Sequence, residues 1–135
     1  MSKTAVNLTV VIDAPAAQVW RMFNDPAFTR QMGGEYVSGW TVGAPIGWHG
    51  EDGTMFTDGS ILKIEPNKLL QHTLFHPDTT DVLATITYEL SEKDGKTTMK
   101  ICERFEEPIS EDEYDDALGG WEAALDAVKE LLGNA

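Results

Sequence analysis

The chain has 135 residues, of which 41% are hydrophobic and 24% charged, and its formal net charge at pH 7 is −13. This size and composition predict a single domain over residues 1–135, and the negative charge excludes nucleic acid, whose phosphates would be repelled. With no apolar run of about 20 residues and no signal-peptide pattern, we expect a cytoplasmic protein without membrane insertion.

The first thirty residues predict a strand followed by two short helices. Residues 4–12 partly alternate, with apolar side chains on one face, as in a half-buried strand. Pro15 suits a first helical turn, and the apolar spacing that follows fits a short helix over 15–25. Asp25 can cap a second helix whose first residue is Pro26.

From about residue 36 to residue 105, short alternating runs separated by turn residues predict an antiparallel meander. The six runs are residues 36–42, 45–50, 59–65, 68–75, 81–90 and 96–105. Asp52-Gly53, Pro66-Asn67 and Asp94-Gly95 fall between runs, and Asp-Gly is a strong hairpin signal.

The last segment predicts one long helix. Ser110 and Glu113 form a capping box, so the helix begins near residue 111, and Gly133 supplies its end. About 22 residues give a length of about 33 Å. Apolar residues spaced four and three apart form one stripe: Tyr114, Leu118, Trp121, Leu125, Val128 and Leu132.

Two adjacent glycines interrupt this run of helix formers. A glycine inside a helix costs about 1 kcal/mol relative to alanine, so the pair requires a reason. Gly120 flanks the apolar stripe, which predicts a close approach of the helix backbone to a neighbour. Gly119 lies almost opposite the stripe, which favours a bend at the pair.

The order of elements and several motifs resemble a known superfamily. "VVIDAPAAQVWRMFNDPAF" resembles the opening motif of the START-like superfamily, also called SRPBCC or the birch-pollen-allergen fold. More narrowly, "GWTVGAPIGWHGEDG", "GSILKIEPNKLLQHTLFHP", "ITYELSEKDGKTTMKI" and "GGWEAALDAVKELL" are similar to the branch of the C-terminal domain of the activator of heat shock protein 90 ATPase. The resemblance implies an α+β helix-grip fold, in which a curved antiparallel sheet of about seven strands wraps a long C-terminal helix.

The resemblance also implies a cavity between the sheet and the helix that often holds an apolar small molecule. A helix stripe and one face of a sheet must bury against each other, which agrees with this arrangement. The residues then expected around the ligand are Trp40, Trp48, Leu70, His72, Leu74, Ile86, Tyr88, Met99 and Ile101 from the sheet, and Tyr114, Leu118, Trp121 and Leu125 from the helix.

Two polar residues fall among these apolar positions. His72 is either a core histidine satisfied by Tyr88 or the backbone, a hydrogen-bonding group for a ligand, or a catalytic group. Glu103 is expected at the sheet end in water, although burial would raise its pKa and make it a site candidate. His76 is four residues from His72 but shares no helical face with it, and no metal, cofactor or assembled nucleophile motif is predicted.

Three functions follow as hypotheses. The first is non-enzymatic binding of an apolar, aromatic or lipid-like small molecule in the cavity. The second is contact with a chaperone of the heat shock protein 90 type through the acidic helix, because residues 103–135 hold eleven acids against two basic residues, a balance of −9. The third is a small-molecule enzyme of the cyclase or dehydratase type that uses His72, Tyr88 or Glu103.

Overall fold

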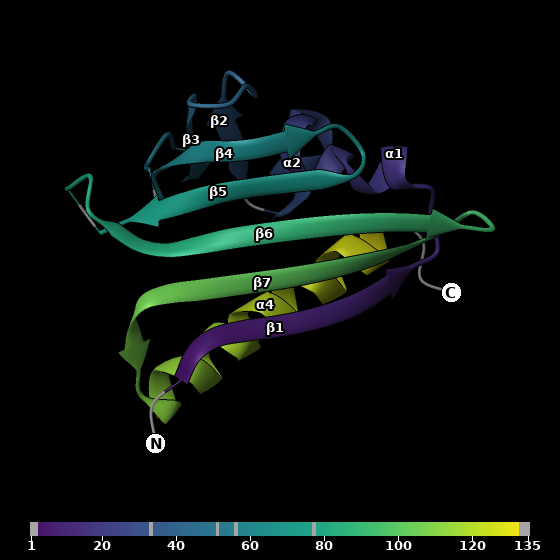
Figure 1. Cartoon of the computed structure of the whole chain (residues 1–135). Helices are drawn as coiled ribbons and strands as arrows, with labels where there is room; N and C mark the ends of the chain where they lie inside the picture. Colours follow the sequence, from purple (N-terminus) through teal and green to yellow (C-terminus); the bar gives the residue numbers. More distant parts are fainter. Residues whose placement is uncertain (1–2, 33, 51, 56, 77, 133–135) are drawn as a thin grey trace.

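The computed structural model describes the chain except residues 1–2, 33, 51, 56, 77 and 133–135. Its described residues form one antiparallel seven-stranded sheet and a long C-terminal helix (Figure 1). The strands are β1 (Lys3–Ile12), β2 (Gly34–Ser38), β3 (Pro45–Gly50), β4 (Gly59–Glu65), β5 (Leu69–Phe75), β6 (Val82–Lys93) and β7 (Lys96–Ile109). Their order is β1-β7-β6-β5-β4-β3-β2. Strands β2 to β7 therefore form the predicted meander, and β1 pairs with β7 as the last strand on that side of the sheet.

Turn residues in left-handed backbone conformations connect the strands. Asp94 and Gly95 have φ of 54° and 78° and join β6 to β7, as expected for the two-residue turn of a tight hairpin. Asn67, between β4 and β5, has φ of 67°. Here asparagine tolerates a conformation that most side chains avoid. The runs predicted at 45–50 and 59–65 coincide residue for residue with β3 and β4.

The prediction for the second strand is wrong. The run at 36–42 was expected to be extended, but β2 ends at Ser38 and Trp40 follows it with φ of 56°. The Ser38 hydroxyl accepts a hydrogen bond from the Trp40 backbone N–H at 3.0 Å, which holds this turn. Trp40 therefore occupies a loop and not an inward position of the sheet, although its ring packs against Tyr36 at 6.3 Å.

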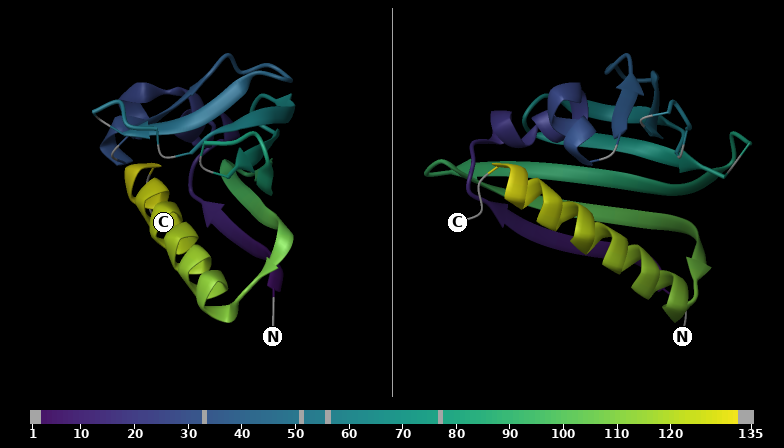
Figure 2. Two further views of the ribbon diagram at one scale, coloured as in Figure 1. Left: turned by 90° about the vertical axis from the view of Figure 1, so that its left-hand side faces the viewer. Right: turned by 180° about the vertical axis from the view of Figure 1, so that it is seen from behind.

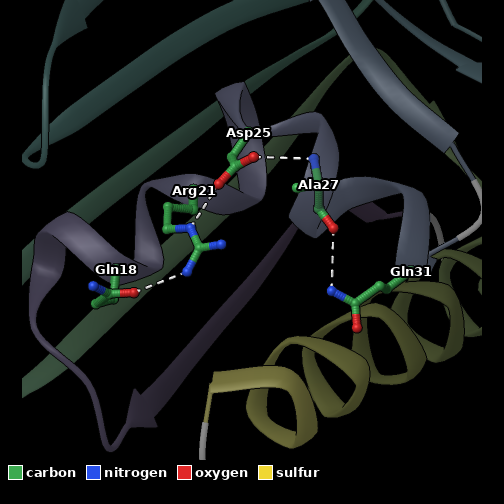
Figure 3. Close-up of polar contacts among 5 residues, drawn as sticks. All are labelled: Gln18, Arg21, Asp25, Ala27 and Gln31. Atoms are coloured by element: carbon green, nitrogen blue, oxygen red, sulfur yellow. Dashed lines mark hydrogen bonds and ion pairs between the residues drawn. The ribbon is translucent and has the colours of Figure 1, made fainter.

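Short helices follow β1, as predicted, but the first is divided. They are α1 (Ala16–Val19), α2 (Arg21–Asn24), α3 (Pro26–Thr29) and the 3₁₀ turn η1 (Arg30–Met32). Asp25 accepts from the backbone N–H of Ala27 at 3.0 Å, which is the predicted cap of α3 (Figure 3). The same carboxylate pairs with Arg21 at 2.8 Å, so one side chain joins α2 to α3.

The long helix α4 (Glu111–Leu132) begins at the predicted residue. Glu113 N–H donates to the Ser110 hydroxyl at 3.1 Å, and Ser110 N–H donates to the Glu113 carboxylate at 3.2 Å, which is a complete capping box. The sheet bends around this helix (Figure 2). Of the predicted stripe, however, only Leu125 and Val128 are buried.

The close approach predicted for Gly120 is also wrong. A methyl group added at Gly119 or at Gly120 would meet no atom within 4 Å outside the helix. The helix continues through both residues without interruption. Among the described glycines, those at which an added methyl group would collide with a neighbouring atom lie in strands. At Gly59 an added methyl would collide with the carbonyl oxygen of Thr73.

The core gathers between the short helices, the sheet and the C-terminal half of α4. Its fully buried members include Val19, Phe23, Tyr88, Met99 and Val128. Phe23 packs edge-on to Tyr88, with ring centroids 4.8 Å apart. The N-terminal half of α4 contributes no buried residue, and this half covers the cavity described next. The architecture is the expected α+β helix-grip fold.

Candidate functional site

A cavity of about 260 Å³ lies between the sheet and the N-terminal half of α4. We call it the ring-lined cavity because four aromatic side chains form much of its wall. Its lining residues are Tyr36, Trp48, Thr57, His72, Leu74, Ile86, Tyr88, Glu103, Ala117 and Trp121. Trp48, Thr57, Ala117 and Trp121 are half-buried, so the cavity reaches the surface of the molecule at this side.

Strand register places His72 and Glu103 in one row of the sheet. His72 on β5 pairs with Ile86 on β6, and Ile86 pairs with Glu103 on β7. Side chains on one row of a sheet point to the same face, and neighbouring strands lie about 4.8 Å apart. His72 and Glu103 therefore stand at the two ends of a row about 10 Å long between their backbones, with Ile86 between them.

His72 lines the cavity and carries a buried nitrogen that has no hydrogen-bond partner. Its side chain is 3% exposed, and Nδ1 lies 3.0 Å from the Thr73 carbonyl oxygen. A carbonyl only accepts, so Nδ1 carries the proton and Nε2 of the neutral ring is an acceptor. Nε2 is buried and has no hydrogen-bond partner. Burial lowers the pKa of His72, which keeps the ring neutral near pH 7.

Glu103 lies at the other end of the row and not in water as expected. It is 9% exposed, and its carboxylate accepts a hydrogen bond from the Trp121 indole N–H at 3.0 Å. Burial raises the pKa of Glu103, and the bond from Trp121 acts against that rise. The bond also fixes α4 to β7 at the cavity wall.

The ring of Tyr88 contacts both His72 and Trp121. Its ring stacks on His72 at 6.0 Å with an interplanar angle of 25°, and it meets Trp121 edge-on at 5.8 Å. Burial raises the pKa of Tyr88 well above its usual range, and Tyr36 and Glu103 raise it further. Burial likewise raises the pKa of Tyr36, which shares a hydrogen bond with Tyr88. Both phenols are therefore protonated at neutral pH.

The structure brings together six of the thirteen residues expected around a ligand, namely Trp48, His72, Leu74, Ile86, Tyr88 and Trp121. The other seven do not line the cavity. Leu70, Met99, Ile101 and Leu125 belong to the packed core, and Trp40 lies in its loop. Tyr114 and Leu118 are half-buried on α4 outside the cavity wall.

Four lining residues were missing from the expected set: Tyr36, Thr57, Glu103 and Ala117. Two of them carried a signal in the sequence. Ala117 is one helical turn before Trp121 and so shares its face. Glu103 occupies the inward register of β7, opposite Ile86. Tyr36 on β2 is paired with Trp48 on β3. To predict this pairing, one would have to know where β2 begins and ends. Thr57 lies outside the strands and carried no signal.

Among the other depressions of the described surface, two have much larger volumes than this cavity. One of about 480 Å³ covers the opposite face of the sheet, where Gln71 and Thr87 already bond each other at 3.0 Å. Another of about 700 Å³ lies beside the β5–β6 connection and is lined by Asp58, Asp78 and Asp81. Neither contains a buried, unpaired polar atom like Nε2 of His72.

Within the described residues, no cluster of three or more histidine, cysteine or acidic side chains is arranged to hold a metal ion. No helix in the described ranges is long and apolar enough to cross a membrane.

A curved antiparallel sheet around one long C-terminal helix, with a cavity between them, defines a START-like protein of the helix-grip class. Within this class the family model "Activator of Hsp90 ATPase homolog 1-like protein" matches residues 13–133, and the chain belongs to that family. The resemblance found in the sequence motifs is thereby confirmed.

Solved structures share the fold over nearly the whole chain. Protein MLL2253 from Mesorhizobium loti has a TM-score of 0.78 at 23% identity, over 95% of this chain and 96% of that one. The Aha1 dimer from Colwellia psychrerythraea has a TM-score of 0.77 at 15% identity, over 96% of each chain. DynU16, from the dynemicin biosynthetic locus, has a TM-score of 0.81 at 20% identity, over 96% of this chain and 47% of that one. No curated protein matches the chain.

Proposed function

We propose that this chain binds a small apolar or aromatic molecule in the ring-lined cavity, as a binding protein and not as an enzyme. The observation that supports this proposal is the residue composition of the cavity wall. Tyr36, Trp48, Tyr88 and Trp121 surround a space of about 260 Å³ together with a small number of polar groups. Binding sites for small molecules have this composition, with apolar walls that supply affinity and a few polar atoms that set orientation.

The volume limits the size of the ligand. An apolar cavity of about 150 Å³ binds benzene, and pockets for drug-sized molecules begin at about 300 Å³. A cavity of about 260 Å³ thus suits a molecule of one or two rings. A long acyl chain exceeds this space, so we narrow the expected ligand from lipid-like molecules to compact aromatic ones.

Thermal unfolding and tryptophan fluorescence with a panel of one- and two-ring compounds test the proposal. At a ligand concentration of about one hundred times Kd, the free energy of unfolding rises by about 2.7 kcal/mol, and Tm rises with it. Trp48 and Trp121 line the cavity, so binding changes their fluorescence. A panel that produces neither change contradicts the proposal.

A matched pair of variants locates the binding. Leu74→Trp places an indole in the cavity and should abolish binding. Thr85→Trp adds the same side chain on the opposite face of the sheet, beside the outer depression, and should leave binding unchanged. If both variants lose binding equally, either the ligand binds elsewhere or the variants are misfolded. Unfolding curves of the ligand-free variants distinguish these two explanations.

Contact with a chaperone of the heat shock protein 90 type is the second candidate. Family membership and the exposed acidic first turn of α4, Glu111 to Glu113, favour it. Co-elution with a purified chaperone would support it, provided that co-elution is lost in the double variant Glu111→Lys/Asp112→Lys and kept in Leu74→Trp.

A cyclase-type reaction through His72 and Glu103 is the third candidate. For such a reaction, mass spectrometry would show conversion of a bound compound. All three fit the expected cytoplasmic location.

A further inference from the structure

We propose that the ring-lined cavity selects an uncharged aromatic ligand that carries a hydroxyl group, and that His72 Nε2 accepts the hydrogen bond from this hydroxyl. The inference rests on the proposed function and names the chemistry of its ligand.

The unpaired nitrogen is the first reason. Within the described residues, two buried side-chain polar atoms have no hydrogen-bond partner, Thr29 Oγ1 and His72 Nε2. Of these, only His72 lines the cavity. A buried acceptor without a donor loses its bonds to water and gains nothing in return. A ligand hydroxyl at Nε2 would restore that bond, whereas a purely hydrocarbon ligand of the same shape would not.

The position of Nε2 is fixed before a ligand arrives. The Thr73 carbonyl holds Nδ1 at 3.0 Å, and the Tyr88 ring stacks on the imidazole. The imidazole therefore has one tautomer and one ring plane, so little freedom is lost on binding. Beside His72 in the same row of the sheet lie Ile86 and then Glu103. A two-ring molecule can lie over this row with its hydroxyl at the His72 end.

The charges of the wall give the second reason. Among the described residues that line the cavity, none is a lysine or an arginine, and Glu103 is the one acidic residue. A ligand carboxylate would meet a bare nitrogen acceptor and a carboxyl group, neither of which stabilises a second negative charge in a buried site. A ligand ammonium would find Glu103 already engaged by Trp121, in surroundings that disfavour ionised groups. The wall thus selects a neutral ligand.

Four probes that share one ring system test the proposal by isothermal titration calorimetry: 2-naphthol, 2-methylnaphthalene, 2-naphthoate and 2-naphthylmethylamine. We expect 2-naphthol to bind about tenfold more tightly than 2-methylnaphthalene, a difference of about 1.4 kcal/mol. The two ions should bind more weakly than 2-naphthol. Tighter binding of either ion, or equal binding of 2-naphthol and 2-methylnaphthalene, overturns the proposal.

A histidine pair supplies the matched control. His72→Phe keeps a ring at the site and removes the acceptor, so the preference for 2-naphthol over 2-methylnaphthalene should fall to within about twofold. His76→Phe makes the same change at an exposed histidine outside the cavity and should keep the tenfold preference. A preference that survives in His72→Phe overturns the proposal.

Nitrogen NMR of the unaltered protein gives an answer that does not depend on the folding of a variant. The Nε2 resonance of His72 should be that of an unprotonated nitrogen, and 2-naphthol should shift it strongly toward lower frequency while 2-methylnaphthalene leaves it in place. An unmoved resonance with 2-naphthol bound overturns this inference and leaves the proposed function intact. Failure of all four probes to bind overturns both.

Discussion

At the scale of single residues, the site is a row of two titratable groups whose surroundings favour their neutral forms. Burial lowers the pKa of His72 and raises the pKa of Glu103. The sequence indicated that both side chains face inward, but it did not predict their states. The free Nε2 depends on the Thr73 carbonyl taking Nδ1. Glu103 was expected at a sheet end, yet β7 continues to Ile109, so this carboxyl lies beneath α4.

The lowered pKa of His72 makes stability depend on pH. The unfolded chain binds a proton near pH 6.5, the ordinary value, whereas the folded protein does so at a lower pH. Between these values the unfolded state holds more protons, so the free energy of unfolding falls as pH decreases, by up to about 1.4 kcal/mol per pH unit. In urea titrations from pH 7 to pH 5.5, the unaltered protein should therefore lose more stability than His72→Phe.

Glu103 also contributes to the pH dependence of the free energy of unfolding, with the opposite sign. This contribution is the same in the unaltered protein and in His72→Phe, so it cancels when the two are compared. The raised pKa of Glu103 means that stability falls as pH increases above 4.5 through the folded value. His76→Phe, the same substitution at an exposed histidine outside the cavity, is the matched control. Parallel curves for His72→Phe and the unaltered protein would show that His72 is not buried in its neutral form.

At the scale of elements, α4 has two functions along its length. Its C-terminal half packs into the core through Leu125 and Val128, and its N-terminal half covers the cavity with Ala117 and Trp121. The capping box and the 3.6-residue period predicted where the helix begins and which face is apolar. They did not predict how deeply each turn is buried, because that depends on the distance between helix and sheet.

This division predicts unequal effects of the same substitution. Leu125→Ala removes a side chain that is 6% exposed in the core and should cost about 2–4 kcal/mol of unfolding free energy. Leu118→Ala, two turns earlier and half-buried, should cost less than half as much. Urea unfolding of both variants checks the difference. Similar costs would mean that the stripe packs uniformly, as the sequence first indicated.

Glycines in α4 and in the sheet should respond in opposite ways to alanine. Gly119→Ala and Gly120→Ala should each stabilise the protein by about 0.5–1 kcal/mol, because alanine favours the helix and nothing blocks its methyl group. Gly59→Ala should destabilise it by about 1–3 kcal/mol, because the methyl group collides with the Thr73 carbonyl oxygen. A destabilised Gly120→Ala in thermal unfolding would restore the close approach that the structure contradicts.

At the scale of the whole molecule, the fold was predictable to a large extent, whereas the lining of the cavity was predictable only in part. Alternating runs and turn residues such as Asp94-Gly95 indicated the meander, since local backbone chemistry decides both. The boundary of β2 was missed because Trp40 belongs to a left-handed turn held by Ser38. Only three-dimensional packing separates residues that line a space, such as Trp48, from those that fill the core, such as Leu70.

Methyl NMR during titration with 2-naphthol tests the central claim most directly, because it locates the ligand. The methyl groups of Leu74 and Ile86 line the cavity, whereas those of Thr85 and Thr87 lie on the opposite face of the same sheet. We predict saturable shifts at Leu74 and Ile86, together with contacts from ligand protons to these methyl groups, and unchanged Thr85 and Thr87. Saturable binding that shifts the threonine methyl groups instead, or no shift at either pair, would contradict a ligand-binding cavity between the sheet and α4.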